Sequence, residues 1–310
     1  MKIFKNPDLL PIGNGGGTCK NIDQVKRLLK TSIGAVEIGS MTKLSRDGNT
    51  GNTFHEGRGY TLNSLGMPNN GEEWYKEHLP EMIEAIHGAN KSAIVNVAGF
   101  NTDEFSSLTR TAFGAGADYV VLNCGCPNVW DNGKQKGILT FDLQGMKETI
   151  SVTIASNPVE SRSGRVGVKL SPITDPLYME KLAEYLNILA NNHLTIAHST
   201  GYIGFVTSIN TIPNCYDEGE VGVSVISNGL AGMAGEAVLP MALGQVKQLR
   251  KLLDPGIKII GIGGVRHGSH VERFMKAGAD FVQITSSYYA RNEDPGVLEQ
   301  IAAEWMTLKE

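Results

Sequence analysis

The stretch KIIGIGGVRHGSHVERFMKAGADFVQITS, residues 258–286, contains a complete strand–helix–strand unit. Apolar, β-branched runs occupy 258–264 and 280–286. They are apolar continuously rather than alternately, which is typical of parallel strands buried on both faces. The segment between them has a helical pattern, and the glycine in KAGAD provides a turn out of the helix. This unit predicts two parallel strands joined by a crossover helix.

The same alternation of strand and helix extends over the whole chain. Similar apolar runs predict further strands over 35–40, 93–99, 118–123, 166–170 and 204–210. Helical patterns occupy 72–89, 175–192 and 236–253. Because no linker or low-complexity segment interrupts the pattern, we predict one α/β domain over residues 1–310, a closed (β/α)8 TIM barrel. An open, doubly wound sheet is the alternative.

Composition excludes several classes of function. The 310 residues carry a formal net charge of −4, which argues against a nucleic-acid partner. No apolar run reaches the roughly 18 residues of a membrane-spanning helix, and the N-terminus lacks the features of a signal peptide. The chain has 4 cysteines, too few for a disulfide scaffold of this length, so we expect a cytoplasmic protein.

A lysine stands inside one of the predicted strands. Lys169 lies in the apolar run 166–170, where an unpaired ammonium group is costly to bury. It is either a structural lysine in a salt bridge or a cation that faces an anion or an electron-rich ring. In a barrel, active-site residues lie at the carboxyl ends of the strands. We therefore include Lys169 among the candidate site residues.

Amide side chains follow several of the predicted strands. A single asparagine usually forms a turn, but here Asn63, Asn123, Asn128 and Asn210, with Thr211, all fall near one end of the predicted barrel. Each amide offers two donors and an acceptor. Several amides together suit a small ring with alternating C=O and N–H groups, such as a pyrimidine.

Two cysteines follow the run 118–123. Cys124 and Cys126 have no second Cys/His pair at zinc-like spacing, so we expect no metal site. They are either packing thiols or, for one of them, a general base in a polar neighbourhood. Strand alternation places Asn123 and Gly125 on one side and Cys124 on the other.

Glycine clusters mark a third kind of site. SNGLAGMAG (227–235) and GIGGVRHGS (261–269) both precede predicted helices. Gly263 and Gly264 end a strand and expose backbone N–H groups where a phosphate can approach. The early loop GNGGGTCK (13–20) is not a Walker A motif, but its glycines allow the backbone to lie flat against a planar ring.

These segments, taken together and in this order, resemble the dihydroorotate dehydrogenases. The similar pieces are LNSLGMPNNG, LNCGCPN, GVKL, INT, NGLAG, IIGIGGV and AGADFVQITS, and the resemblance runs from the loop at 13–20 to the last helix. Members of this family are FMN-containing (β/α)8 barrels that oxidise dihydroorotate to orotate in pyrimidine synthesis.

The resemblance implies a role for each matching residue. It assigns the catalytic base to Cys126, as in class 1 enzymes, where class 2 enzymes use Ser. It assigns pyrimidine binding to the four asparagines, and it places Lys169 beside the flavin. The remaining residues implied in flavin binding are Gly16, Gly17, Lys20, Asn96, Gly232, Gly263, Gly264, Thr285 and Ser286. Cys126 would take a proton from one ring carbon while the adjacent carbon gives hydride to flavin N5.

The sequence departs from the class 1 pattern at two positions. Gly39 stands where class 1 members carry a lysine, and Thr53 where an arginine is usual, whereas Lys20 matches a lysine of class 2. Recognition of the orotate carboxylate is therefore open, and a related enzyme acting on dihydrouracil-type rings is the first alternative. A phosphate-binding lyase or isomerase that uses Lys169, and a binding protein without activity, are others.

The electron acceptor is not encoded in any motif. The class 1 resemblance implies a homodimer that uses fumarate. NAD through an iron–sulfur partner subunit and quinone are the alternatives, and no iron–sulfur motif lies in the chain.

Overall fold

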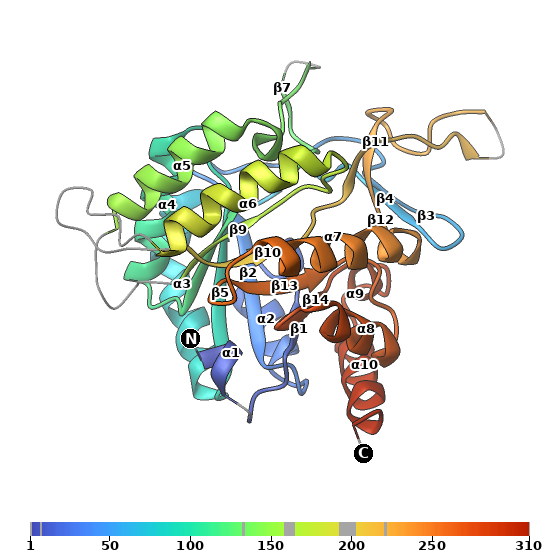
Figure 1. The fold of residues 1–310 in the computed structure, drawn as a ribbon. Coiled ribbons are helices and arrows are strands. Elements are labelled where there is room, and N and C mark those ends of the chain that lie inside the picture. The colour runs from blue at the N-terminus through green and yellow to red at the C-terminus, as the bar shows by residue number, and fades with distance from the viewer. Residues whose placement is uncertain are drawn as a thin grey trace.

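Eight parallel strands close a barrel at the centre of the molecule (Figure 1). The computed structural model describes residues 2–6, 8–131, 134–157, 165–191, 203–219 and 222–309. The order around the barrel is β1-β14-β13-β10-β9-β6-β5-β2. The barrel strands are β1 (Ile12–Asn14), β2 (Ala35–Met41), β5 (Ser92–Val97), β6 (Tyr119–Asn123), β9 (Val166–Lys169), β10 (Ile203–Thr207), β13 (Lys258–Ile262) and β14 (Phe281–Ile284).

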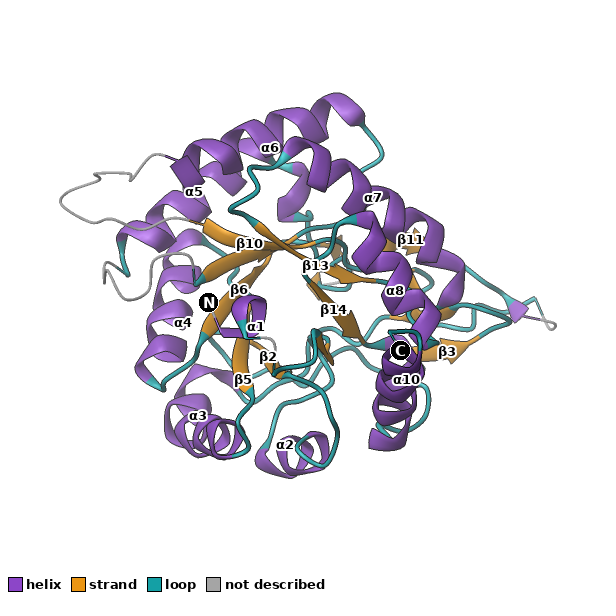
Figure 2. Cartoon of the chain, turned by 60° about the horizontal axis from the view of Figure 1, so that its bottom comes forward, coloured by secondary structure: helices purple, strands orange, loops and turns teal. Residues whose placement is uncertain are grey.

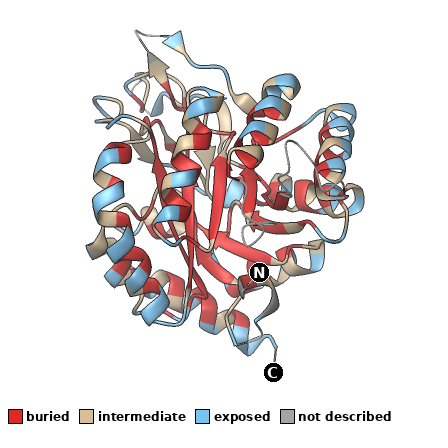
Figure 3. Ribbon diagram, turned by 90° about the vertical axis from the view of Figure 1, so that its left-hand side faces the viewer, coloured by how far each residue is buried: buried red, intermediate tan, exposed pale blue. Residues whose placement is uncertain are grey.

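Helices form a layer around the strands (Figure 2). The long ones are α2 (Ile22–Leu28), α3 (Gly71–Gly88), α4 (Thr102–Gly114), α5 (Leu143–Ala155), α6 (Pro176–Asn191), α7 (Leu239–Leu252), α8 (Gly268–Ala277) and α10 (Pro295–Thr307). The strands are buried almost throughout, whereas the helices are exposed on their outer faces (Figure 3). The continuous apolar pattern of the strands therefore reflects burial on both sides.

All seven predicted strands are confirmed as barrel strands, and the closed (β/α)8 barrel is confirmed over an open sheet. The eighth strand, β1, was not predicted, because its three residues are too few to show a pattern. The last strand ends at Ile284, two residues earlier than predicted, since Ser286 already begins the short helix α9 (Ser286–Tyr289). The predicted helix 175–192 is α6, and Asn192 lies outside the described residues.

The amino-terminal end of the barrel is closed by the start of the chain. The short helix α1 (Lys2–Lys5) lies across this opening (Figure 2). Ile3 and Phe4 pack there against aromatic rings from the strands, among them Tyr119, Phe205 and Phe281. With this end filled, the carboxyl end of the barrel is the open one.

Two accessory β-structures stand at the carboxyl end. A four-stranded sheet has the order β11-β12-β4-β3 and joins two loops far apart in the sequence. Its strands are β3 (Phe54–Glu56), β4 (Thr61–Asn63), β11 (Ile212–Cys215) and β12 (Ala231–Ala234), and β7 (Trp130–Asp131) with β8 (Lys134–Gln135) forms a small hairpin. A short hydrogen bond from the Tyr60 hydroxyl to Asp217 ties the two loops together. The sheet thus builds a wall above the barrel mouth.

Candidate active site

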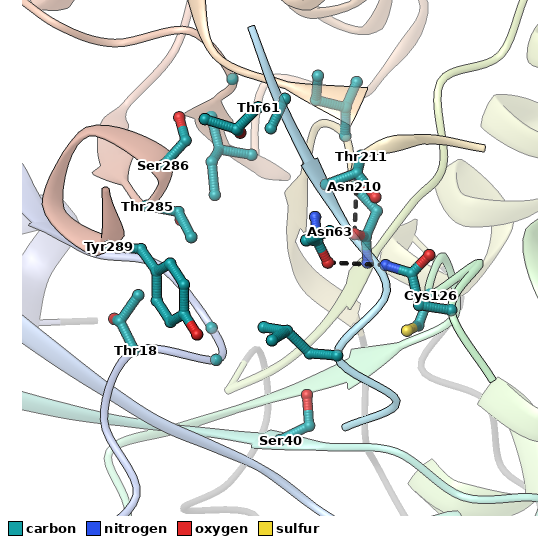
Figure 4. A pocket seen from close by; sticks show the side chains of 18 of the residues that line it. Thr18, Ser40, Thr61, Asn63, Cys126, Asn210, Thr211, Thr285, Ser286 and Tyr289 are labelled. Atoms are coloured by element: carbon teal, nitrogen blue, oxygen red, sulfur yellow. Dashed lines mark hydrogen bonds between the residues drawn. The ribbon is translucent and has the colours of Figure 1, made fainter. Parts of the chain in front are cut away.

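A cavity lies at the carboxyl ends of the barrel strands, and its space amounts to about 1140 Å³ when the opening to solvent is included. Its walls come from the loops after the strands and from the four-stranded sheet. Figure 4 shows Cys126, Asn63 and Asn210 on one side of it and Thr285, Ser286 and Tyr289 on the other. The predicted residues that line it are Gly16, Gly17, Lys20, Asn63, Asn123, Cys126, Asn128, Lys169, Asn210, Thr211, Gly263, Gly264, Thr285 and Ser286.

Cys126 lies in the loop that follows β6, between this cavity and a second one lined by Phe100 and Lys136. Burial raises the pKa of its thiol. The backbone N–H of Asn128 and the positive charges of Lys169, Arg46 and Lys136 oppose that rise. Its neighbour Cys124 is 2% exposed and belongs to the hydrophobic core, with a pKa raised to about 12 by burial. Of the two thiols, Cys126 is therefore the one that can react with a ligand in the cavity.

Lys169 ends strand β9 and stands at the floor of the cavity. It pairs in register with Asn123 on β6 and Thr207 on β10, which puts the ammonium and the first amide at the same level of the barrel. Burial lowers the pKa of Lys169, and the negative charges of Glu37 and Cys126 oppose this. Lys169 lines the cavity and makes no ion pair within 4 Å to another described residue, which favours the second of the two sequence-based possibilities, a cation that faces a ligand.

The four asparagines form two hydrogen-bonded chains rather than isolated groups. In the first, Asn210 Nδ2 donates to Asn123 Oδ1 at 3.1 Å, and Asn123 Nδ2 donates to Ser40 Oγ at 3.0 Å. In the second, Asn128 Nδ2 donates to Asn63 Oδ1 at 2.8 Å, and Asn63 Nδ2 donates to the carbonyl of Gly232 at 3.2 Å. Because each amide is held by at least one hydrogen bond, its orientation is fixed before any ligand enters, and each keeps a second N–H that makes no hydrogen bond to another described residue and can bind a ring.

Opposite the amides, the loops after β13 and β14 form a cradle of glycines and hydroxyls. Gly263 and Gly264 have φ values of 119° and 77°, which side chains other than glycine rarely adopt. Thr285 Oγ1 is buried and has no hydrogen-bond partner among the described residues, and Ser286 lies beside it. Backbone that can approach closely, together with an unpaired buried hydroxyl, suits a phosphate group.

The early glycine loop forms the third wall. Gly16 passes so close to the barrel interior that a Cβ there would lie 2.5 Å from Glu37 Oε1. Gly17 has a φ of 97° and open space where its Cβ would be. Lys20 reaches the cavity from the same loop, and burial lowers its pKa. This wall presents bare backbone, the Thr18 side chain and one cation to the cavity.

Two of the predicted residues do not line the cavity. Asn96 is completely buried inside the barrel, behind Gly16, where a Cβ on Gly16 would lie 2.8 Å from Asn96 Nδ2. Gly232 lies in β12 on the side of the amides, and it contributes its carbonyl to Asn63.

Sequence reasoning missed several lining residues. Phe54 on β3 and Tyr289 on α9 meet edge to face over the cavity, with ring centroids 4.9 Å apart. Ser40 and Gln283 also line it. Gln283, like Lys169, is a polar residue inside an apolar run, so the same signal could have identified it.

Neither a metal site nor a membrane span is present in the described part of the chain. The described His, Cys, Asp and Glu side chains form no group of three that could hold a metal ion. None of the helices within the described ranges is both long enough and apolar enough to cross a bilayer.

The whole chain is similar in sequence to one group of enzymes. A family model described as Dihydroorotate dehydrogenase matches residues 2–307. Dihydroorotate dehydrogenase (fumarate) from Saccharomyces cerevisiae is 29% identical over 316 residues, which cover 100% of this chain and 92% of the relative. A putative dihydroorotate dehydrogenase A (fumarate) from Streptococcus pyogenes is 27% identical over 280 residues, covering 90% and 80%.

Solved structures agree at the level of the fold. The ligand-free DHODH of Eimeria tenella superimposes with a TM-score of 0.77 at 19% identity, covering 96% of this chain and 84% of that one. The same protein in complex with ferulenol gives a TM-score of 0.75. Since the family model spans nearly the full length, the chain belongs to the dihydroorotate dehydrogenase family.

Proposed function

We propose that this chain oxidises dihydroorotate to orotate in pyrimidine biosynthesis, with FMN as its cofactor and fumarate as electron acceptor. One observation carries the proposal. The Cys126 thiol, the Lys169 ammonium and the asparagine amides open into the same cavity as the glycine and hydroxyl cradle. A proton acceptor, a ring-binding set and a phosphate site thus share one space, as a flavin enzyme acting on a small ring requires.

The residues around the cavity fit FMN. Gly263, Gly264, Thr285 and Ser286 would hold its phosphate, and the unpaired Thr285 hydroxyl supports this. The bare backbone at Gly16 and Gly17 leaves room for a flat ring system, with Lys20 and Lys169 near it. When bound, the flavin supplies the hydride acceptor for the reaction.

Cys126 acts as the general base. It accepts the proton from the ring carbon next to a carbonyl, while the neighbouring ring carbon loses hydride, so that the single bond between them becomes double. The thiolate is the form that accepts the proton, and the positive charges of Lys169, Arg46 and Lys136 favour it against the effect of burial. Proton removal by a positioned base contributes roughly 10²–10⁴ in rate.

The asparagines orient the substrate. Asn63 and Asn128 come from β4 and from the loop of Cys126, and their mutual hydrogen bond fixes the distance between that loop and the sheet. A hydrogen bond between Asn210 and Asn123 likewise fixes these two amides at the carboxyl end of the barrel. Because the amides are already oriented, they hold the substrate ring in position for Cys126 with little further loss of conformational entropy. This pre-orientation lowers the barrier of the reaction.

Lys169 provides electrostatic stabilisation at the floor. Lys169 as a residue is 6% exposed, so its charge acts in a region from which water is largely excluded. The Lys169 ammonium would stabilise negative charge that develops on a ring above it. This attraction is stronger here than between the same two charges in water.

Fumarate as electron acceptor, a homodimer and a cytoplasmic location complete the proposal. The relatives in yeast and Streptococcus pyogenes carry fumarate in their names, which supports fumarate here. The homodimer and the cytoplasmic location stay predictions from the resemblance and the composition.

A dihydropyrimidine without a carboxylate is the second candidate substrate. Gly39 carries no side chain to meet the orotate carboxylate, and of the described residues that line the cavity only Lys20 and Lys169 are cations. Anaerobic titration of the purified protein with dihydroorotate and with dihydrouracil separates the two. Loss of the visible flavin absorbance with dihydroorotate supports the proposal. Loss with dihydrouracil alone shows that the substrate is a dihydropyrimidine without a carboxylate. A colourless protein without flavin refutes the proposal.

A further inference from the structure

A buried carboxylate lies directly beneath the cavity and has no part in the chemistry described above. Glu37 on β2 is 1% exposed. Its Oε1 accepts a hydrogen bond from Asn96 Nδ2 at 2.8 Å, and its Oε2 accepts a short one from Gln283 Nε2. Asn14 holds its backbone on both sides, accepting from its N–H at 2.9 Å and donating to its C=O at 2.8 Å. Strands β5 and β14 therefore hold the carboxylate of Glu37, and β1 holds its backbone.

The carboxylate dictates which way the two amides face. An ionised carboxylate only accepts hydrogen bonds, so Asn96 and Gln283 must turn their NH₂ groups toward it and their oxygens away. Asn96 Oδ1 and Gln283 Oε1 are both buried, and neither has a hydrogen-bond partner among the described residues. Buried acceptors are rarely left unpaired in folded proteins, so such a pair points to a donor that the protein itself does not supply.

One of these two amides borders the cavity. Gln283 lines it together with Lys169, so a side-chain amide with an unpaired oxygen and an ammonium group border the same space. Asn96 and Glu37 lie just behind Gly16, within 2.8 Å of where its Cβ would be. The floor is thus a layer of lining residues held in place by a polar layer beneath it.

We propose that Glu37 orients Gln283, and Asn96 behind it, so that the cavity floor recognises the C2=O and N3–H edge of a flavin. Lys169 donates to the carbonyl and Gln283 Oε1 accepts from the N–H. A ring without that N–H leaves the Gln283 oxygen unpaired and is discriminated against. The inference rests on the FMN site proposed above. The flavin is the ring concerned because the substrate amides belong to β4, to the end of β6 and to the loops after β6 and β10, whereas Gln283 belongs to β14, which precedes the cradle.

Glu37 acts through its neighbours and is a positioning residue. In the E37Q variant, residue 37 carries a donor as well as an acceptor. One neighbouring amide can then reverse and still be satisfied, and a reversed Gln283 turns N–H toward the cavity instead of C=O. The shape of the floor is kept, but its preference for a donor is lost.

The test compares the binding of FMN and of 3-methyl-FMN, which lacks the N3–H, to the full chain freed of flavin. Fluorescence quenching on titration gives both dissociation constants. For the wild type we expect FMN to bind at least about tenfold more tightly than the analogue, which is the effect of one buried hydrogen bond. In E37Q the preference should fall to about threefold or less, the methyl group's bulk accounting for the rest.

Two further variants make the result specific. Glu72 is equally buried, at 1% exposure, but it is bonded to Lys43, Ser107 and Thr111 away from the cavity. E72Q should keep the wild-type preference. Q283M removes the acceptor directly and should lower the preference as E37Q does, which provides the test if E37Q does not fold.

The outcomes separate this inference from the function on which it depends. Equal binding of the two flavins by the wild type overturns the inference and leaves the FMN assignment in place. A full preference in E37Q or in Q283M also overturns it. A wild-type protein that binds neither flavin refutes the FMN site and the inference together.

Discussion

Asn128 Nδ2 donates a 2.8 Å hydrogen bond to Asn63 Oδ1, which joins the loop of Cys126 to strand β4 of the sheet above the barrel mouth. Asn49 Nδ2 adds a second tie at 3.2 Å to the backbone carbonyl of Asn128. The position of the thiol therefore depends on a sheet that is distant from it in the sequence. Residues that bind the substrate also hold the base in place, so the two functions should be coupled.

This coupling predicts that N63A and N128A are not additive. Each substitution removes a partner of the other, and we expect each to lower kcat/KM by about tenfold, the effect of one hydrogen bond. The fold-reduction in kcat/KM of the double variant should be smaller than the product of the two single fold-reductions, which corresponds to a coupling energy of about 0.5–1.5 kcal/mol. Steady-state kinetics of the four proteins measures this cycle. Strict additivity would show that the two amides act independently.

The environment of Cys126 predicts the pH dependence of the reaction. Burial raises the pKa of the thiol, so the thiolate is a minor form at neutral pH and flavin reduction should accelerate as the pH rises. Arg46 lowers this pKa. R46Q should therefore shift the rise to higher pH, whereas K134Q, on the β7–β8 hairpin, should not. The rate of iodoacetamide alkylation of Cys126 as a function of pH reads the same ionisation without turnover, and identical profiles for wild type and R46Q would refute the assignment.

The cradle predicts a steric effect on cofactor binding. Gly264 has a φ of 77°, and a Cβ there would lie 2.9 Å from the backbone nitrogen of Leu239. G264A should cost about 1–2 kcal/mol in stability from the backbone alone, and should weaken FMN binding as the cradle shifts.

Gly244 provides the matched control for that substitution. It lies in α7, and a Cβ there meets no atom within 4 Å. G244A should stabilise the protein by up to about 1 kcal/mol and leave FMN affinity unchanged. Thermal unfolding and flavin titration distinguish the two variants, and equal FMN affinity in G264A and G244A would contradict a cradle at Gly264.

The barrel was predictable because most of its strands are long and continuously apolar. β1 escaped detection since Ile12–Asn14 is a three-residue strand with a glycine at its centre and another directly after it. The strands of the accessory sheet, such as FHE in β3 and TLN in β4, are equally short and of mixed polarity. Their partners lie far along the chain, and no local pattern reveals such pairing.

The site was partly predictable from polar residues at strand ends. Lys169 was identified because it interrupts an apolar run, and Glu37 and Gln283 interrupt theirs in the same way without having been recognised. The asparagines could be found at strand ends, but their pairing into two chains depends on how loops fold over the barrel. The contact of Phe54 with Tyr289 is of the same kind, since it joins the first part of the chain to the last.

The central claim is that the Cys126 thiol and a bound flavin act on the same ring in one cavity. The most direct measurement is single-turnover flavin reduction by dihydroorotate in C126A, with flavin content determined on the same sample and C215A as the control thiol variant. We predict that C126A retains FMN and reduces it roughly 10²–10⁴ times more slowly, while C215A behaves as the wild type. Undiminished flavin reduction in C126A would contradict the account.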